Sequence, residues 1–207
     1  MRFRLAASQV KFTPCVLAAI ISVICAANAK ASPITYTESS TVSGTLNSVS
    51  FTNELLTLTG TGDTASVTNP ISGLFSNPVG TVSFTLGAVS GTFTDAFDVS
   101  SCSACGVPGL AGFFDLGVND LLNTLSAAFA TYALSIPIGP VTGSSFISGL
   151  GFPVSTGGNL TITSAGNATF TAVVTPVVPL PTALPLFATG LAGLGLLGWR
   201  RKKKAAA

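Results

Sequence analysis

The chain contains no histidine among its 207 residues. Histidine is the most frequent general base of enzymes and the most frequent zinc ligand. Its absence excludes Ser–His–Asp and Cys–His catalysis and removes the usual donor of zinc sites. We therefore predict that the protein is not an enzyme, and that it holds no metal ion and no other cofactor.

Basic residues are missing from the middle of the chain. All nine Lys and Arg residues lie in the first 30 positions or in residues 200–204, whereas all seven Asp and Glu residues lie between them. Ser32–Pro176 therefore has 0 basic and 7 acidic residues, a net charge of −7. A region without a positive side chain cannot neutralise a phosphate backbone, so nucleic acid is excluded as its partner.

Charged residues are scarce altogether, at 8% of the chain. The chain is nevertheless 47% hydrophobic and contains 14 Phe residues, so it can bury a core and is not disordered by composition. The 145 residues of Ser32–Pro176 are an ordinary length for one domain.

The N-terminal end has the layout of a secretory signal peptide. Met1–Lys11 is short and basic, and Cys15–Ala27 is an apolar run of 13 residues. As a helix, this run would span roughly 20 Å, which is less than the roughly 30 Å of a bilayer core. We predict a signal peptide over residues 1–31, cleaved after Ala29 or Ala31.

The C-terminal end has the layout of a membrane span. Pro179–Trp199 has 21 residues and no charge, which in a helix would span roughly 31 Å. A basic cluster follows at once, consisting of Arg200, Arg201, Lys202, Lys203 and Lys204. We predict a transmembrane helix over 183–199 with this cluster as its cytoplasmic stop. The precursor would then be anchored in the inner membrane, with its body outside the cytoplasm.

A short proline motif precedes the predicted span. It consists of Val178, Pro179, Leu180, Pro181 and Thr182. With the apolar stretch and basic cluster behind it, the motif resembles the PEP-CTERM sorting signal in its VPLP variant, over residues 177–204. The resemblance implies recognition by an exosortase, a membrane-embedded enzyme that cuts near the prolines and passes the body to the surface of a Gram-negative-type bacterium. It also implies a link to exopolysaccharide.

The proline motif also suits processing on physical grounds. Pro179, Pro181 and Pro185 keep the entrance to the span out of regular helix, because each lacks an N–H and restricts the residue before it. An extended segment at the membrane surface is accessible to a protease. Leu180 departs from the usual Glu of the family, which leaves the exosortase subtype open. The alternative is a permanent single-pass anchor.

The body between the two ends is rich in Ser and Thr, which make up 44 of its 145 residues. Six stretches alternate polar and apolar residues: Thr45–Phe51, Leu55–Thr59, Gly80–Leu86, Gly91–Phe97, Asn159–Thr163 and Ala168–Val174. This period, with turn residues between the stretches, predicts short half-buried strands. We predict an all-β body over 32–176, folded as an antiparallel sandwich or jelly roll.

One stretch departs from the strand pattern. Asp120–Leu134 has apolar residues at helical spacing, and we expect at most one short helix there. Its second half, Ala130–Ile136, fits a strand equally well.

Cys102 and Cys105 form a C-x-x-C motif. A zinc site would need two further ligands, which the exported chain does not have. In an oxidising compartment we predict a disulfide between the two cysteines. Free or intermolecular thiols and redox catalysis are the alternatives.

The remaining candidate groups are carboxylates and aromatic rings. The carboxylates considered for glycoside hydrolysis or calcium binding are Asp95, Asp98, Asp115 and Asp120. Their spacing matches no calcium loop, and we interpret them as exposed groups at strand ends. Tyr36, Tyr132 and the Phe residues could stack on sugars, but alternating Phe residues are typical of a core.

Three functional hypotheses follow. The first is an exported structural or interaction protein of the bacterial surface or extracellular matrix, which the composition favours. The second is a carbohydrate-binding module or adhesin, which an exposed row of aromatic side chains would support. The third is a secreted hydrolase, which would need two carboxylates converging in a cleft.

Overall fold

The computed structural model describes residues 31–103, 109–115, 119–148, 151–155 and 158–176. These residues belong to the second of two units into which the chain divides, Met1–Lys30 and Ala31–Ala207. The predicted signal peptide and the predicted sorting segment lie outside the described ranges and stay predictions. Within those ranges, the structure has no helix of the length and hydropathy needed to cross a membrane.

The described residues form twelve strands and two short 3₁₀ helices. The strands are β1 (Pro33–Leu46), β2 (Val49–Asp63), β3 (Thr68–Ile71), β4 (Leu74–Gly80), β5 (Ser83–Leu86), β6 (Val89–Thr92), β7 (Phe97–Cys102), β8 (Leu110–Asp115), β9 (Asp120–Leu125), β10 (Ile138–Phe146), β11 (Gly151–Val154) and β12 (Gly158–Val174). The 3₁₀ helices are η1 (Thr64–Ser66) and η2 (Ala127–Phe129). Each pair of neighbouring strands is antiparallel, so the predicted all-β antiparallel body is confirmed.

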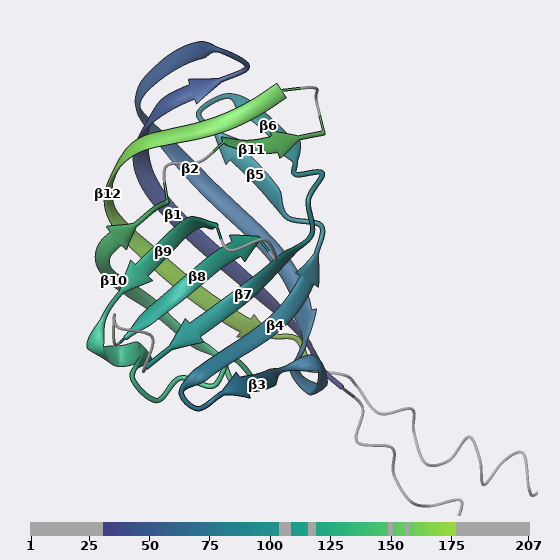
Figure 1. The fold of residues 1–207 in the computed structure, drawn as a ribbon. Helices are drawn as coiled ribbons and strands as arrows, with labels where there is room; N and C mark the ends of the chain where they lie inside the picture. The colour runs from purple at the N-terminus through teal and green to yellow at the C-terminus, as the bar shows by residue number, and fades with distance from the viewer. Residues whose placement is uncertain (1–30, 104–108, 116–118, 149–150, 156–157, 177–207) are drawn as a thin grey trace, which may run out of the picture. The chain divides into compact units, whose positions relative to one another are not determined.

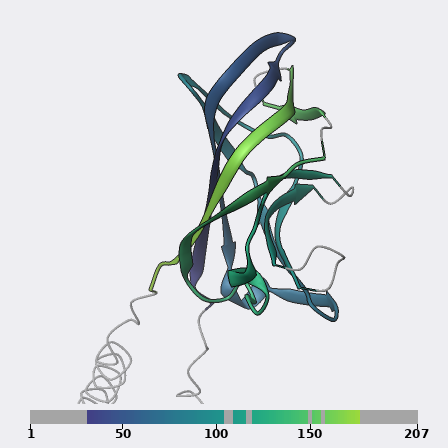
Figure 2. The same cartoon turned by 90° about the vertical axis from the view of Figure 1, so that its left-hand side faces the viewer.

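All twelve strands belong to one sheet that curls back on itself. The order is β3-β4-β7-β8-β9-β10-β12-β1-β2-β5-β6, with β11 paired to β12. Because the sheet curls, β2 contacts β4, and β9 contacts both β1 and β12 across the interior. Strands β4, β7, β8 and β9 cross in front of β1, β2 and β12 (Figure 1). Figure 2 shows the two layers from the side, with the purple β1 and the green β12 in one and teal strands in the other.

Aromatic rings fill the space between the layers. Phe93 contacts Phe84 and Phe97 at centroid distances of 5.1 and 5.2 Å. A second group gathers around Phe170, whose ring is 5.6 Å from Phe129 and 6.1 Å from Tyr132. All these rings are at most 3% exposed, which confirms the prediction that the alternating Phe residues form the core.

Two of the stretches that were predicted as single strands are each interrupted in the structure. Thr45–Phe51 contains the β1–β2 turn, because Asn47 and Ser48 both have positive φ angles of 52° and 66°. Two central residues with positive φ make the type I′ turn, whose twist suits a hairpin. Gly91–Phe97 is likewise divided, since β6 ends at Thr92 and β7 begins at Phe97. Conversely, the central strands β1, β2 and β12 are longer than expected, at 14, 15 and 17 residues.

Asp120–Leu134 contains one short helix, which agrees with the expectation of at most one, but the helical spacing of its first part does not form a helix. Asp120–Leu125 is β9, which pairs with β8 on one side and β10 on the other. Backbone partners on both sides override a local helical pattern. The expected short helix is reduced to the three residues of η2. Residues 130–136 form turns and bends, so the strand interpretation of Ala130–Ile136 is wrong too.

Candidate functional site

A hollow of about 420 Å³ lies between the β1–β2 hairpin and the β5–β6 hairpin, and we call it the hairpin hollow. Its apolar lining consists of Leu46, Val49, Phe51, Leu86, Ala88 and Val89. Glu54 is the acidic residue of the lining. The volume is within the range of about 300–1,000 Å³ that is typical of small-molecule sites.

The hairpin hollow depends on a tight approach between its two hairpins. Gly87 has a φ of +55°, and a Cβ at this position would lie 2.5 Å from the Glu54 carboxylate. The N–H of Gly87 donates to the carbonyl of Leu55 at 3.1 Å, which fixes the β5–β6 turn to β2. Val49 is 70% and Val89 48% exposed, so the hollow has apolar side chains open to solvent.

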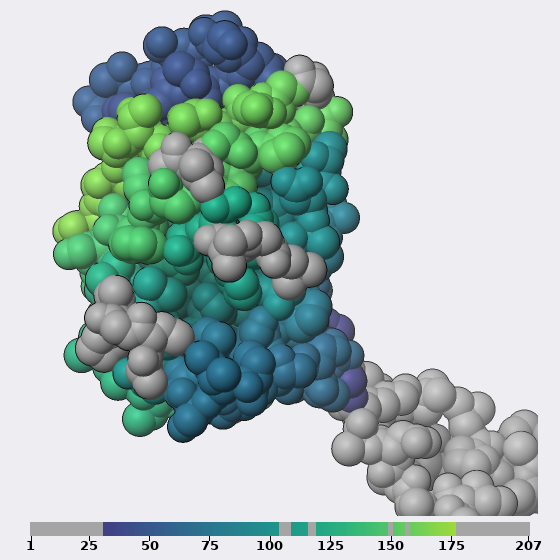
Figure 3. Space-filling model, viewed as in Figure 1, coloured from purple at the N-terminus to yellow at the C-terminus, as the bar shows by residue number. Residues whose placement is uncertain are grey.

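A second, polar hollow of about 540 Å³ lies on the other side of the β1–β2 turn. It is lined by Thr45, Asn47, Ser48, Gly158, Asn159 and Thr161. The N–H of Asn47 donates to the carbonyl of Asn159 at 3.0 Å, so the tip of the hairpin is held against the start of β12. Figure 3 shows this tip at the top of the body, above the green surface of β12. One turn thus separates an apolar hollow from a polar one.

A buried carboxyl group, Glu38, lies inside the body on β1. Its side chain is 0% exposed, and the Thr124 hydroxyl on β9 donates to Oε1 at 2.7 Å. Burial raises the pKa of Glu38 well above its ordinary value, against the opposing effect of hydrogen bonds from Thr124 and the backbone of Phe113. The nearby carboxylate of Asp120 raises the pKa of Glu38 further. Burial thus favours the neutral form of this carboxyl group, and its hydrogen bond with Thr124 links the two layers.

A second buried polar contact joins three distant segments. The Tyr36 hydroxyl donates to the carbonyl of Leu134 at 2.6 Å and accepts from Nδ2 of Asn77 at 2.7 Å. Burial raises the pKa of Tyr36 to about 12. Among the described residues, the buried side-chain atoms Oδ1 of Asn77, Oε2 of Glu38 and Oδ1 of Asn123 have no hydrogen-bond partner.

Neither polar contact was predicted from the sequence. In the stretch Ile34–Val42, every second residue is buried, and this alternation places Tyr36 and Glu38 on the inner face. The same period-two rule that found strands elsewhere would have found these two residues. It could not have found their partners, which come from the opposite layer.

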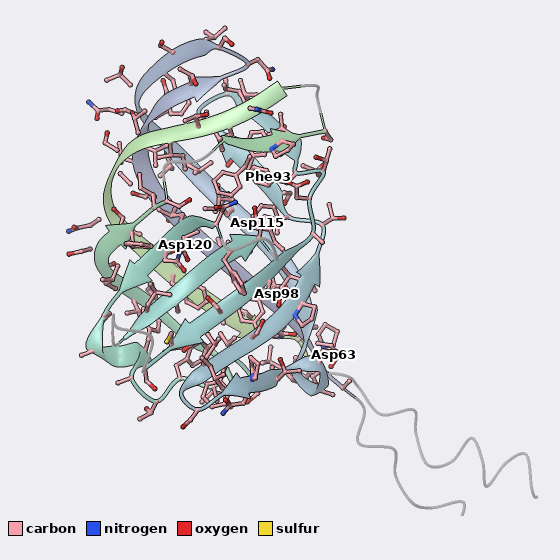
Figure 4. The ribbon with its side chains drawn as sticks, in the orientation of Figure 1. Asp63, Phe93, Asp98, Asp115 and Asp120 are labelled. Carbon is pink, nitrogen blue, oxygen red and sulfur yellow. The ribbon has the colours of Figure 1, made fainter. Side chains whose placement is uncertain are left out.

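The four Asp residues considered for catalysis make local contacts. Asp98 accepts a hydrogen bond from Ser76 and is 7% exposed, so its assignment to an exposed strand end is wrong. Asp120 accepts from Nδ2 of Asn123 at 2.8 Å, and burial raises the pKa of Asp120. Figure 4 shows Asp115 and Asp120 on the neighbouring strands β8 and β9.

Asp115 accepts from Asn119, whose backbone N–H lies 3.2 Å from its carboxylate. Asp95, the remaining candidate, precedes β7 and is half-buried. Within the part of the chain that the structure describes, no three His, Cys, Asp or Glu side chains are grouped closely enough to hold a metal ion. None of the four Asp residues lines the hairpin hollow or the polar hollow.

The aromatic surface that was the alternative to a Phe core is not seen on the described residues. Tyr36 and Tyr132 are 0% and 3% exposed, and Phe146 at 39% is the aromatic residue among the exposed large hydrophobic side chains there. Cys102 is buried at the end of β7. Cys105 lies outside the described residues, so the predicted disulfide stays a prediction. The sorting motif, residues 178–182, and the basic cluster, residues 200–204, lie outside them as well.

No protein-family model, curated protein or solved structure matches this chain.

Proposed function

We propose that the chain is an exported structural or interaction protein of the surface or extracellular matrix of a Gram-negative-type bacterium. The export rests on the signal-peptide pattern of residues 1–31. Sorting rests on the PEP-CTERM-like tail, which an exosortase-type enzyme would process after the precursor is anchored by its single span. The association with exopolysaccharide comes from the family resemblance. In this proposal the sandwich-like body of residues 32–176 is presented to the outside and carries out no catalysis.

The observation that supports the proposal is the place where β12, the last described strand, ends. β12 ends at Val174, which pairs with Ile34 at the start of β1. The N–H of Thr175 donates to the carbonyl of Pro33 at 2.9 Å and closes this end of the sheet. A cut behind residue 176 would therefore leave every strand that the structure describes in place.

The same pairing places the end of β12 far from the hairpin hollow. The β1–β2 turn lies at the far end of β1, 14 residues from the position where β12 ends. At about 3.3 Å per residue, this is a separation of roughly 40 Å. A body held at its closed end would present the hairpin turns outward. This arrangement favours a binding or adhesin role as the second candidate function, and the hairpin hollow is the feature that would serve it.

The sorting proposal is tested by the mass of the mature protein. Changing Pro179 and Pro181 to Ala should leave the span intact but block processing, so that the uncut precursor accumulates. Pro176→Ala is the matched control, since Pro176 is exposed and lies outside the motif. Deleting Pro179–Ala207 should leave a folded body that is released from its sorting route. If mature wild-type protein from the cell surface still contains Trp199, a permanent anchor is the better account.

A further inference from the structure

We propose that the hairpin hollow binds a small amphiphile, namely an aliphatic chain that ends in one protonated amine. The inference concerns the body alone, so it does not depend on the export and sorting proposed above. It rests on three features of the hollow: an apolar lining, a single carboxylate, and the absence of any basic side chain from the body.

The apolar lining supplies the affinity for an aliphatic chain. Leu46 and Phe51 are partly buried and pack against the core, so the floor of the hollow is continuous with the interior. Val49 and Val89 form its exposed walls, one on each hairpin. An aliphatic ligand would remove these side chains from water, which is favourable in proportion to the apolar area buried.

The carboxylate selects the head group. Glu54 lies over the backbone of Gly87 at the meeting point of the two hairpins. Because Ser32–Pro176 contains no Lys, Arg or His, no side chain of the body can neutralise this charge. A ligand with a carboxylate head would add a like charge at this point. A protonated amine would supply the missing opposite charge and donate hydrogen bonds to the carboxylate.

A second copy of the body fits the hollow less well. Two apposed hollows would bring together two Glu54 side chains on bodies that each carry a net charge of −7. Like charges without a cation between them disfavour association. An occupant that brings its own positive charge therefore fits the hollow better than a second copy does.

The test compares three probes with the same chain and different heads: octylammonium, octanol and octanoate. Binding to the purified protein is followed at neutral pH by NMR, with probe concentrations below those of micelle formation. We expect octylammonium to bind most tightly and octanoate most weakly, with shift changes confined to residues of both hairpins. Glu54→Gln should reduce the octylammonium affinity by about twofold to fivefold, the range of an exposed ion pair, and leave octanol unchanged.

Matched controls separate the hollow from general surface effects. Val89→Ser should weaken all three probes by about fivefold, since it removes apolar contact area. Ile71→Ser removes a side chain of similar exposure, 60%, from β3 and should change none of the affinities. Asp63→Asn removes one negative charge outside the lining and should leave octylammonium binding at the wild-type level.

Three results would overturn the proposal. The first is octanoate binding as tightly as octylammonium. The second is an Ile71→Ser effect equal to that of Val89→Ser. The third is a dimer in sedimentation experiments that Val49→Asp disrupts, because a second copy would then be the occupant.

Discussion

Removal of the Tyr36 hydroxyl should destabilise the body more than the loss of a single hydrogen bond. The substitution Tyr36→Phe keeps the ring and its contact with Phe170, whose centroid is 6.1 Å away. It deletes the one atom that satisfies both the carbonyl of Leu134 and Nδ2 of Asn77. Two buried polar groups are then left without their partner.

The magnitude follows from burial. Tyr36, Asn77 and Leu134 are all 0% exposed, so water does not reach the vacated position from the surface. Each unsatisfied buried group costs about 1–3 kcal/mol, and partial relaxation brings the expected loss for both to about 3 kcal/mol. For a body of this size, that corresponds to a fall in Tm of roughly 10 °C.

The measurement is urea denaturation of the purified protein, followed by circular dichroism and extrapolated to zero denaturant. The matched control is Tyr132→Phe, which loses one partly buried hydrogen bond of 3.1 Å to the carbonyl of Ile136 and should cost about 1 kcal/mol. Adding Asn77→Leu to Tyr36→Phe should recover about 1 kcal/mol, because the orphaned amide is removed. The reasoning is refuted if Tyr36→Phe costs no more than Tyr132→Phe.

Three other predictions concern the interior and the cysteines. Burial raises the pKa of Glu38, so the folded state holds this proton more tightly than the unfolded state does. The contribution of Glu38 to the free energy of unfolding should therefore be complete at pH values below the ordinary pKa of Glu. It should be lost as the pH rises from that value to the raised pKa. In urea denaturation across this range, Glu38→Gln should flatten the fall, whereas Glu54→Gln, the same substitution at an exposed position of β2, should not. A Cβ at Gly44 would overlap the backbone of β12. Gly44→Ala should therefore lower the free energy of unfolding by about 2 kcal/mol. An unchanged midpoint of thermal unfolding would contradict this. Cys102 and Cys105 should resist alkylation in the exported protein until a reductant is added, and immediate labelling of both, seen by mass spectrometry, would argue against their disulfide.

The class of the fold could be predicted from the sequence because strand alternation is a local property. Leu55–Thr59 and Ala168–Val174 alternate in the sequence, and both lie within long strands of the sheet. The same alternation assigned the Phe residues to the core, where they are found. Local pattern was insufficient at Asn47 and Ser48, where two residues with positive φ turn an apparently continuous strand into a hairpin.

The candidate site was not predicted, because it is made by segments that are distant in the sequence. Val49 and Val89 belong to different hairpins, and β5 meets β2 through pairs such as Leu58 and Phe84. No spacing within either hairpin indicates that the two will enclose a hollow. The approach depends on the register of these strands and on the room left by Gly87.

Composition alone determined the electrostatic character of the body. With seven acidic and no basic residues in Ser32–Pro176, no buried acid can find a cationic partner there, whatever the fold. The tertiary structure decided which of the acidic residues is buried without a counter-ion. The curl of the sheet places Glu38 of β1 against Thr124 of β9, 86 residues further along the chain. Because burial depends on what the opposite layer covers, the raised pKa of Glu38 is a property of the folded sheet, whereas the lack of a counter-ion is a property of the sequence.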